Sequence, residues 1–167
     1  MVSVGIITVS DRSSRGERED RGGPLLARLV TENGWEVKAT AVIPDEQKMI
    51  ESKLIEFADG LKLDLILTTG GTGFSPRDVT PEATLAVVEK RAPGIAEAMR
   101  LESLKITPMA MLSRAEAGIR GQSIIINLPG SPKAIKECLN VVMPALGHGI
   151  EILKGLTGDC AEKLNRP

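Results

Sequence analysis

Three apolar runs, each ending in a turn or a polar loop, constrain the fold of this chain more than any other feature. They are "VSVGIITV" at 2–9, "WEVKATAVI" at 35–43 and "LDLILTT" at 63–69, with segments of helical character between them. Short apolar runs rich in β-branched residues are typical of buried strands. Strands that alternate with helices form mostly parallel sheets. The sequence therefore predicts a three-layer α/β fold, with a mostly parallel twisted sheet and helices on both faces.

Proline and glycine mark the expected helix ends. A first helix is expected from Pro24, after two glycines, to Asn33-Gly34, and a second lies within 45–58, where apolar residues recur at helical spacing. Thr80 is predicted to be the N-cap of a third helix, with Pro81 at its first position. That helix should end before Pro93, because a residue that precedes proline disfavours the helical conformation.

The second half of the chain predicts further helices and an antiparallel excursion of the sheet near 114–128. Helices are expected at 94–104, from Thr107-Pro108, and from Ser131-Pro132, where Pro144 either kinks the helix or starts a new segment. The stretch "SRAEAGIRGQSIIINLPGSP" indicates strands at 114–119 and 123–128 around a glycine turn. With 167 residues, we expect one domain at 1–157 and a loose tail at 158–167.

Composition argues against several classes of function. The formal net charge is −1 with interspersed signs, and two Phe, one Trp and no Tyr leave no stacking platform, so nucleic acid is not expected as a partner. No apolar run approaches the roughly 18 residues of a membrane span, and the amino terminus lacks the basic region of a signal peptide. Cys138 and Cys160 are far apart, which suits a reducing compartment. A cytoplasmic protein without membrane association is expected.

Ligands of such sheets bind outside the carboxyl ends of the strands. The loops at this edge are 10–22, 44–46, 69–78 and 128–131. In the third loop, "TTGGTG" combines glycines, which allow positive φ and a close approach of a ligand to the backbone, with hydroxyl groups. A phosphate would fit there, although the lysine of a P-loop is missing. The alternative is a flexible connection between strand and helix.

Two carboxylates belong to the same edge. Asp78 follows the glycine cluster, and Asp45 follows the second strand. Each could simply support the start of a helix, which favours negative charge. Together, beside a phosphate site, they would suit a magnesium ion and a metal-assisted phosphoryl or nucleotidyl transfer.

Two more loops offer weaker candidates. Ser131 can cap the helix that Pro132 begins, and the free amides of that first turn form a potential anion site. Ser10 and Asp11 lie in the first loop, for which the alternative is a solvated charged loop. His148, the one histidine, is expected on a helix surface rather than in catalysis.

Four motifs in order make a specific resemblance: "TVSDRSSRGEREDRGGP" at 8–24, "IPDE" at 43–46, "TTGGTGFSPRDVTPEAT" at 68–84 and "NLPGSPKA" at 127–134. Together they resemble the molybdopterin adenylyltransferase family, which includes the MogA and MoaB proteins and the G domain of gephyrin-like proteins. The resemblance spans nearly the whole chain.

This resemblance implies an α/β domain that assembles as a homotrimer and binds molybdopterin. It implies that ATP and Mg2+ are used to make adenylylated molybdopterin and pyrophosphate, and that the product passes to a downstream molybdenum-insertion protein. The acids of the family motifs match Asp45 and Asp78, as catalytic and metal-binding residues. The substrate-binding positions match Ser10, Asp11, Thr69, Gly70, Gly71, Thr72, Gly73, Pro129, Gly130 and Ser131.

Three alternatives stay open at this point. One is a molybdopterin-binding paralogue without catalysis, and another is a scaffold with a vestigial pocket. The third is the related domain of competence-damage-inducible proteins, which act on pyridine nucleotides, although their amino-terminal loop differs from "SDR" followed by two glycines. The motifs do not separate the MogA from the MoaB branch, or a molybdenum from a tungsten pathway.

Overall fold

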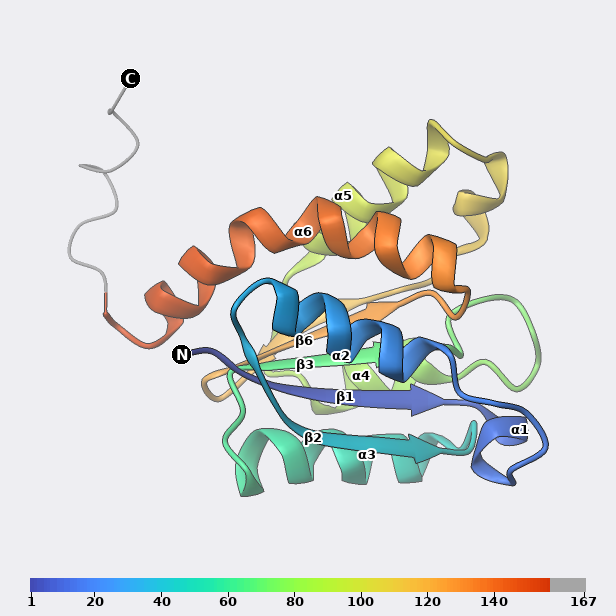
Figure 1. Ribbon diagram of the computed structural model, residues 1–167, viewed down its shortest axis with the longest axis horizontal. Coiled ribbons are helices and arrows are strands. Elements are labelled where there is room, and N and C mark those ends of the chain that lie inside the picture. Colours follow the sequence, from blue (N-terminus) through green and yellow to red (C-terminus); the bar gives the residue numbers. More distant parts are fainter. Residues whose placement is uncertain (157–167) are drawn as a thin grey trace.

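The computed structural model describes residues 1–156 and contains a sheet with the strand order β2-β1-β3-β6-β5-β4 between two helix layers (Figure 1). Neighbouring strands are parallel from β2 to β6, whereas β5 is antiparallel to β6 and β4 is antiparallel to β5. The predicted three-layer α/β fold and its antiparallel excursion are confirmed. The strands are β1 (Ser3–Val9), β2 (Glu36–Ile43), β3 (Leu65–Thr69), β4 (Lys90–Arg91), β5 (Ala117–Arg120) and β6 (Ser123–Leu128).

The helices follow the predicted order with several corrections. They are α1 (Asp11–Ser14), α2 (Gly22–Glu32), α3 (Gln47–Ile55), the π-helical turn η1 (Glu56–Gly60), α4 (Thr80–Val87), α5 (Pro93–Leu104), the 3-10 helix η2 (Pro108–Leu112) and α6 (Pro132–Leu153). The short helix α1 and the two-residue strand β4 were not predicted. The start of α2 was predicted two residues late: the carboxylate of Asp20 accepts a hydrogen bond from the Gly23 amide, which draws both glycines into the first turn.

Helix α6 continues through Pro144, so of the two alternatives for this proline, the start of a separate second segment was wrong. A proline inside a helix leaves the carbonyl four residues earlier without its donor. Here that carbonyl belongs to Asn140, and both residues are exposed. Water can therefore satisfy the free carbonyl, and the helix does not need to end.

Two apolar cores lie on opposite faces of the sheet. In the sheet, β2 lies on one side of β1 and β3 lies on the other. Because both crossover connections are right-handed, α2 and α3 lie on opposite faces of the sheet. Along β1, Val4 and Ile6 face α2, α5 and α6, whereas Ile7 and Val9 face α3 and α4. This alternation comes from the two-residue period of a strand. It keeps the sheet buried on both faces and leaves its carboxyl edge for polar loops.

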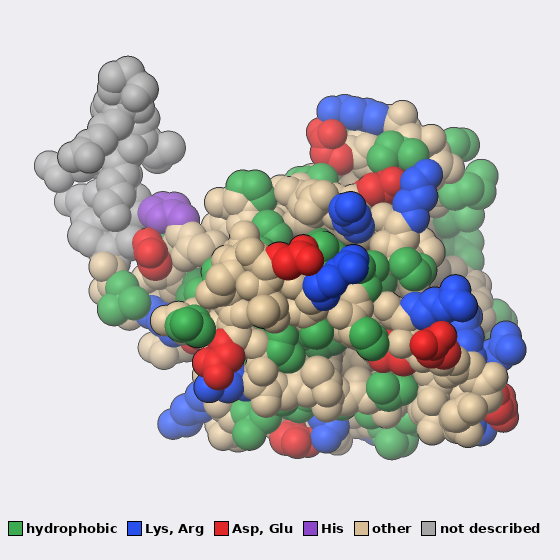
Figure 2. Space-filling view, viewed as in Figure 1, with side chains coloured by type: hydrophobic (Ala, Val, Ile, Leu, Met, Phe, Trp, Pro, Cys, Tyr) green, Lys and Arg blue, Asp and Glu red, His purple; other side chains and the backbone are tan. Residues whose placement is uncertain are grey.

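The surface and the remaining segments add three observations. Figure 2 shows acidic and basic side chains interspersed over the face that it presents. Within residues 1–156, no helix has both the length and the apolar character needed to cross a membrane. The tail expected at 158–167, with Cys160, lies outside the described residues, and the single-domain assignment of 1–157 stays a prediction.

The edge opposite the predicted site is held by a buried ion pair. Asp64, just before β3, accepts hydrogen bonds from the backbone amide of Ser3 at 2.8 Å and from its hydroxyl at 3.0 Å. The Lys154 ammonium lies 2.5 Å from the other carboxylate oxygen. Burial alone would raise the pKa of Asp64, but the bonds from Lys154 and Ser3 outweigh it and lower the pKa below its ordinary value. The pair joins the end of α6 to the starts of β1 and β3.

Asp64→Asn should lower the free energy of unfolding by about 1–3 kcal/mol at pH 7, the range for hydrogen bonds to a charged group. A carboxyl whose pKa falls on folding contributes stability above its unfolded pKa of about 3.9, and this contribution is lost as the pH drops through the folded pKa. Urea denaturation at pH 7, 5 and 3 should therefore show the difference between wild type and variant shrinking only in the most acidic sample. As a control, Asp59→Asn removes an exposed ion pair and should have a smaller effect; an equal loss would contradict the prediction.

Candidate active site at the carboxyl edge of the sheet

A polar cavity of about 370 Å³ lies where the strand order reverses, at the carboxyl ends of β1 and β3. Reversal points of this kind are the usual ligand sites of open α/β sheets, because the loops of neighbouring strands there lead to opposite faces and leave a crevice. The lining includes Ser10, Arg18, Arg21, Thr69, Gly70 and Ser131. The structure thus brings together three of the four loops predicted at this edge.

The chemistry of the polar cavity suits an anion. The hydroxyl of Ser131 accepts a hydrogen bond from the Ala134 amide at 3.3 Å and caps α6, as predicted, so the positive end of a long helix dipole faces the cavity. Arg18 and Arg21 add cationic side chains to the wall. Asp20 accepts from the Thr8 hydroxyl at 2.8 Å and fixes the first loop over the strand end. Glu19 and Asp20 also line the cavity and Arg21 pairs with Glu19, so the start of α6 and the hydroxyl and amide donors, rather than net charge, favour a phosphate group here.

A second cavity, of about 340 Å³, lies on the other side of the turn at 129–131. It is walled by Thr72 and Gly73 from the glycine loop and by residues of α5, η2 and α6, including Met99, Ala110 and Cys138. Burial raises the pKa of the Cys138 thiol, although a contact with Ser103 opposes this, so Cys138 acts as an apolar wall residue rather than as a nucleophile. Pro129 and Ser131 line this cavity, and Ser131 lines both.

Close backbone packing explains the glycines at this edge. Gly70 and Gly71 have φ of 95° and 67°, and a side chain on Gly70 would overlap the Val9 carbonyl. The Gly70 amide donates to the Leu128 carbonyl at 3.2 Å. The Thr69 hydroxyl donates to the Pro129 carbonyl at 2.8 Å. The glycine loop and the turn at 129–131 are therefore fixed to each other, and the hydroxyl of Thr69 is engaged in holding that turn.

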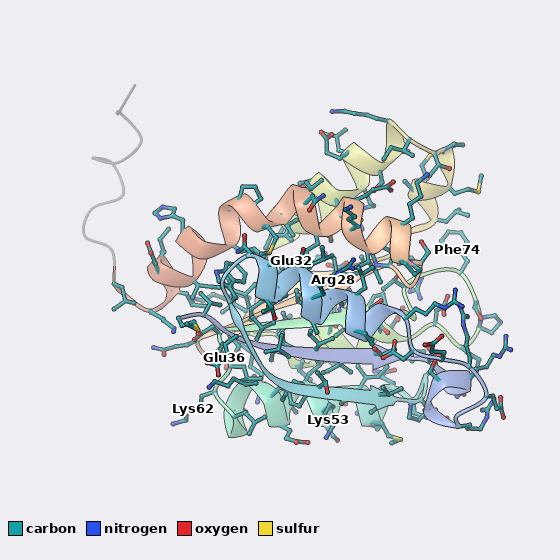
Figure 3. The ribbon with its side chains drawn as sticks, viewed as in Figure 1. Arg28, Glu32, Glu36, Lys53, Lys62 and Phe74 are labelled. Carbon is teal, nitrogen blue, oxygen red and sulfur yellow. The ribbon has the colours of Figure 1, made fainter. Side chains whose placement is uncertain are left out.

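Asp78 closes the loop between β3 and α4. Its Oδ2 atom accepts from the amides of Gly73 at 3.1 Å and Ser75 at 3.0 Å, so the carboxylate is held inside the loop and makes no cap to α4. Figure 3 shows Phe74 of this loop at the end of the molecule where α1 lies. The loop folds back on the carboxylate, so any support that Asp78 gives to the start of α4 comes from its charge and not from a capping hydrogen bond.

Thr80 was predicted to cap α4, and this was wrong. Thr80 is the first residue of the helix, and the N-cap position belongs to Val79, which makes no side-chain cap. The Thr80 hydroxyl donates to the Gly70 carbonyl at 3.0 Å, and its amide donates to the Gly71 carbonyl at 3.1 Å. The glycine loop competes for the hydroxyl, so Thr80 fastens the loop to the helix instead.

Asp45 and Asp11 form a reciprocal pair between two strand ends. The Asp11 amide donates to Oδ2 of Asp45 at 2.8 Å, and the Asp45 amide donates to Oδ1 of Asp11 at 3.0 Å. The other oxygen of Asp45, Oδ1, would lie 3.1 Å from a Cβ on Gly71. Burial raises the pKa of Asp45, and the charges of Asp11 and Asp78 add to this rise. Asp45 therefore faces the glycine loop from one side, as Asp78 does from within it.

Ser10 has a role that the sequence did not predict. Its hydroxyl accepts from the Ser13 amide at 3.2 Å and caps α1, and its own amide donates to the Ile43 carbonyl at 2.9 Å. The first loop is thereby fixed beside the end of β2, which brings Asp11 next to Asp45. His148 lies on α6 with a 47% exposed side chain, a surface position as expected.

Two arginines of the site were not identified as functional candidates from the sequence. Arg77 binds Asp11 with two hydrogen bonds and Glu46 with one. Arg114 donates to the carbonyls of Gly73 at 2.7 Å and Asp78 at 2.8 Å and pairs with Glu82, so it stabilises the loop between β3 and α4. Arg77 precedes the predicted site residue Asp78 in the sequence, and this position could have identified it as a candidate. No local sequence pattern identifies Arg114, because its carbonyl partners lie more than thirty residues earlier in the chain.

The acids present fit a magnesium ion that also binds a substrate. Within residues 1–156 no group of three or more Asp, Glu, His or Cys side chains is arranged to hold a metal. Oδ1 of Asp45 and Oδ1 of Asp78 receive no hydrogen bond within the same residues. Mg2+ typically takes one or two protein carboxylates and completes its shell with water and phosphate oxygens. Asp45 and Asp78 supply two carboxylates against the glycine loop, whose Gly70 lines the polar cavity, while neither acid lines the cavity itself.

Comparison with known proteins identifies the family of the chain. Residues 5–148 match the family model described as "Probable molybdopterin binding domain". The chain belongs to this family. The match covers all four motifs noted in the sequence, from the loop after β1 to the turn before α6.

Named relatives within the molybdopterin-binding family are similar over most of their length. The molybdopterin adenylyltransferase of Helicobacter pylori strain J99 is 45% identical over 157 residues, which cover 92% of this chain and 89% of the relative. That of Escherichia coli K12 is 47% identical over 154 residues, which cover 88% and 78%. The crystal structure of the molybdopterin biosynthesis enzyme MoaB from Thermus thermophilus superposes with a TM-score of 0.88 at 49% identity, covering 93% of this chain and 98% of that one.

Proposed function

We propose that this protein is a molybdopterin adenylyltransferase of molybdenum cofactor biosynthesis, which transfers AMP from ATP to the terminal phosphate of molybdopterin. One observation carries the proposal: Asp45 and Asp78 both lie against the glycine loop, which lines the polar cavity at Gly70 and the apolar second cavity at Thr72 and Gly73. An enzyme that joins two phosphorylated ring compounds needs both kinds of cavity. The relatives named as molybdopterin adenylyltransferases support the assignment.

The reaction requires positioning more than proton transfer. An oxygen of the molybdopterin phosphate attacks the α-phosphorus of ATP, a new P–O bond forms, and the bond between that phosphorus and the pyrophosphate oxygen breaks with its electron pair. A phosphate monoester is already ionised at neutral pH, so no strong general base is needed, in keeping with the surface position of His148. Bound Mg2+ would neutralise the charge on the phosphates.

Different residues of this chain would bind the metal, the phosphate groups and the ring system. Asp45 and Asp78 would hold the metal, while the amides of Gly71 and Thr72 and those of the first turn of α6 would bind phosphate oxygens. The apolar cavity would receive a planar ring system. Fixed loops suit this chemistry, because donors that are already oriented need no reorganisation as charge moves.

Incubation with molybdopterin, Mg2+ and labelled ATP tests the proposal. The expected result is release of pyrophosphate that depends on molybdopterin, together with a labelled molybdopterin adduct. Binding of molybdopterin without pyrophosphate release would indicate the non-catalytic paralogue. Neither binding nor release would indicate a scaffold. Omission of Mg2+ in the presence of a chelator should abolish release, and full activity without a divalent cation would contradict the metal-binding role of the two acids.

The protein is further proposed to act as a homotrimer in the cytoplasm and to pass its product to a molybdenum-insertion protein. An exposed apolar surface over α5 and η2 supports assembly, and Figure 2 shows apolar side chains gathered over this region. A surface of this kind usually marks an interface. Analytical ultracentrifugation should give three times the mass of one chain. The exposed apolar residues that form the surface over α5 and η2 are Leu101, Leu104, Ile106, Met109, Met111 and Leu112.

A further inference from the structure

One side chain links three loops of the site without lining either cavity. Arg77, in the loop that Asp78 closes, reaches across to the first loop and binds Asp11 with Nε at 2.9 Å and Nη2 at 3.0 Å. The same Nη2 atom donates to Glu46 at 2.9 Å, just before α3. The loops after β1, β2 and β3 therefore share one guanidinium group.

The contact with Asp11 continues to the acid proposed as a metal ligand. Asp11 binds Arg77 with both carboxylate oxygens, and its amide donates to Oδ2 of Asp45. The amide of Asp45 returns a hydrogen bond to Oδ1 of Asp11. A shift of the Asp11 side chain would break its bond with the Asp45 amide, and a movement of the Asp11 backbone that followed would release Oδ2 of Asp45. A two-point arginine bond fixes a carboxylate in direction as well as in distance.

We infer that Arg77 is a positioning residue that holds Asp45 in place through Asp11, so that Oδ1 of Asp45 stays turned towards the glycine loop. As far as catalysis is concerned, this rests on the proposed function. Without Arg77, the carboxylates of Asp11 and Glu46 would repel each other and the carboxylate of Asp45. Arg77 places a cation among them, and the hydrogen bonds that it donates to Asp11 and Glu46 raise its pKa, so it stays charged at every relevant pH.

A purely stabilising surface ion pair is the competing explanation, and it makes different predictions. The Arg77 side chain is 54% exposed, and exposed ion pairs contribute little to stability. Arg91 offers a matched control. Its side chain is 60% exposed, against 54% for Arg77, and its partner Glu116 is 18% exposed, against 22% for Asp11. Arg91 lines neither cavity. Beyond what the partner holds, Arg77 differs in having a second acidic partner, Glu46, and in binding Asp11 through two nitrogen atoms, whereas Arg91 binds Glu116 through Nη2 alone.

The test compares the wild type with Arg77→Gln, Arg77→Lys and Arg91→Gln by hydrogen exchange and by kinetics. In Arg77→Gln, the amides in 10–16 and 43–48 should exchange about tenfold faster or more, while the melting temperature stays within about 4 °C of wild type. The kcat should fall about 10- to 100-fold, the usual effect of removing a residue that orients a metal ligand, with a smaller change in KM.

Arg77→Lys should fall between wild type and Arg77→Gln in both measurements, because lysine keeps the charge but cannot bind a carboxylate at two points. Arg91→Gln should match wild type. The inference is overturned if Arg77→Gln exchanges and reacts like Arg91→Gln, or if its exchange rises throughout the chain with a large loss of melting temperature. If wild type itself releases no pyrophosphate, the proposed function fails, and the exchange measurement still decides the role of Arg77.

Discussion

Asp78→Asn and Asp45→Asn should each lower the kcat of AMP transfer by about 100-fold or more while the fold and molybdopterin binding persist. In each variant the amide oxygen can still accept the hydrogen bonds that Oδ2 accepts now, from Gly73 and Ser75 or from Asp11. The amide nitrogen that replaces Oδ1 carries no negative charge and cannot bind a metal. The variants therefore remove the proposed ligand and keep the loop.

The measurements are pyrophosphate release under saturating substrates, molybdopterin binding by calorimetry and urea denaturation. The free energy of unfolding should change by less than about 1 kcal/mol, because the loop hydrogen bonds remain. Asp59→Asn, an exposed acid near the opposite edge, serves as the control and should retain full activity. Turnover like that of wild type in both site variants would reject Asp45 and Asp78 as the acids of the reaction.

Gly70→Ala should be among the most destabilising single changes at this edge, costing about 3 kcal/mol or more. Part of the cost is the positive φ, which costs an L-residue about 1–2 kcal/mol. The larger part is steric, because the new methyl group would overlap the Val9 carbonyl, and backbone cannot rotate away as a side chain can. The shift of the loop should also reduce AMP transfer.

Gly34→Ala separates the two contributions. Gly34 has φ of 79°, close to that of Gly70, but a Cβ there would meet no atom within 4 Å. Its free energy of unfolding should fall by only about 1–2 kcal/mol, and its activity should remain normal. Equal losses in urea denaturation for the two variants would show that conformation alone, and not contact with β1, requires glycine at position 70.

The sequence was sufficient for the sheet because its signals are local. The apolar runs that became β1, β2 and β3 depend on β-branched residues in a row, and the loops at their ends follow from parallel topology. Ser131 was predicted as a cap because the serine and proline of a helix start are adjacent. These features need no knowledge of distant residues.

The errors come from hydrogen bonds that form only when the loops fold, some within one loop and others between distant segments. Thr80 looks like a cap in sequence, yet a carbonyl of the glycine loop takes its hydroxyl. Asp78 looks like a helix support, yet it binds amides earlier in its own loop. Arg114 has no local pattern at all, since its carbonyl partners come from a different segment. Hydrogen bonds of this kind depend on the folded arrangement of loops, which a single sequence does not specify.

The three-residue turn at 129–131 forms a partition between the two cavities, and it is anchored to the glycine loop by Thr69. The two cavities are therefore neighbours across a single turn, and Ser131 lines both. In the proposed reaction, compounds that enter from opposite sides would come together at the edge of this turn.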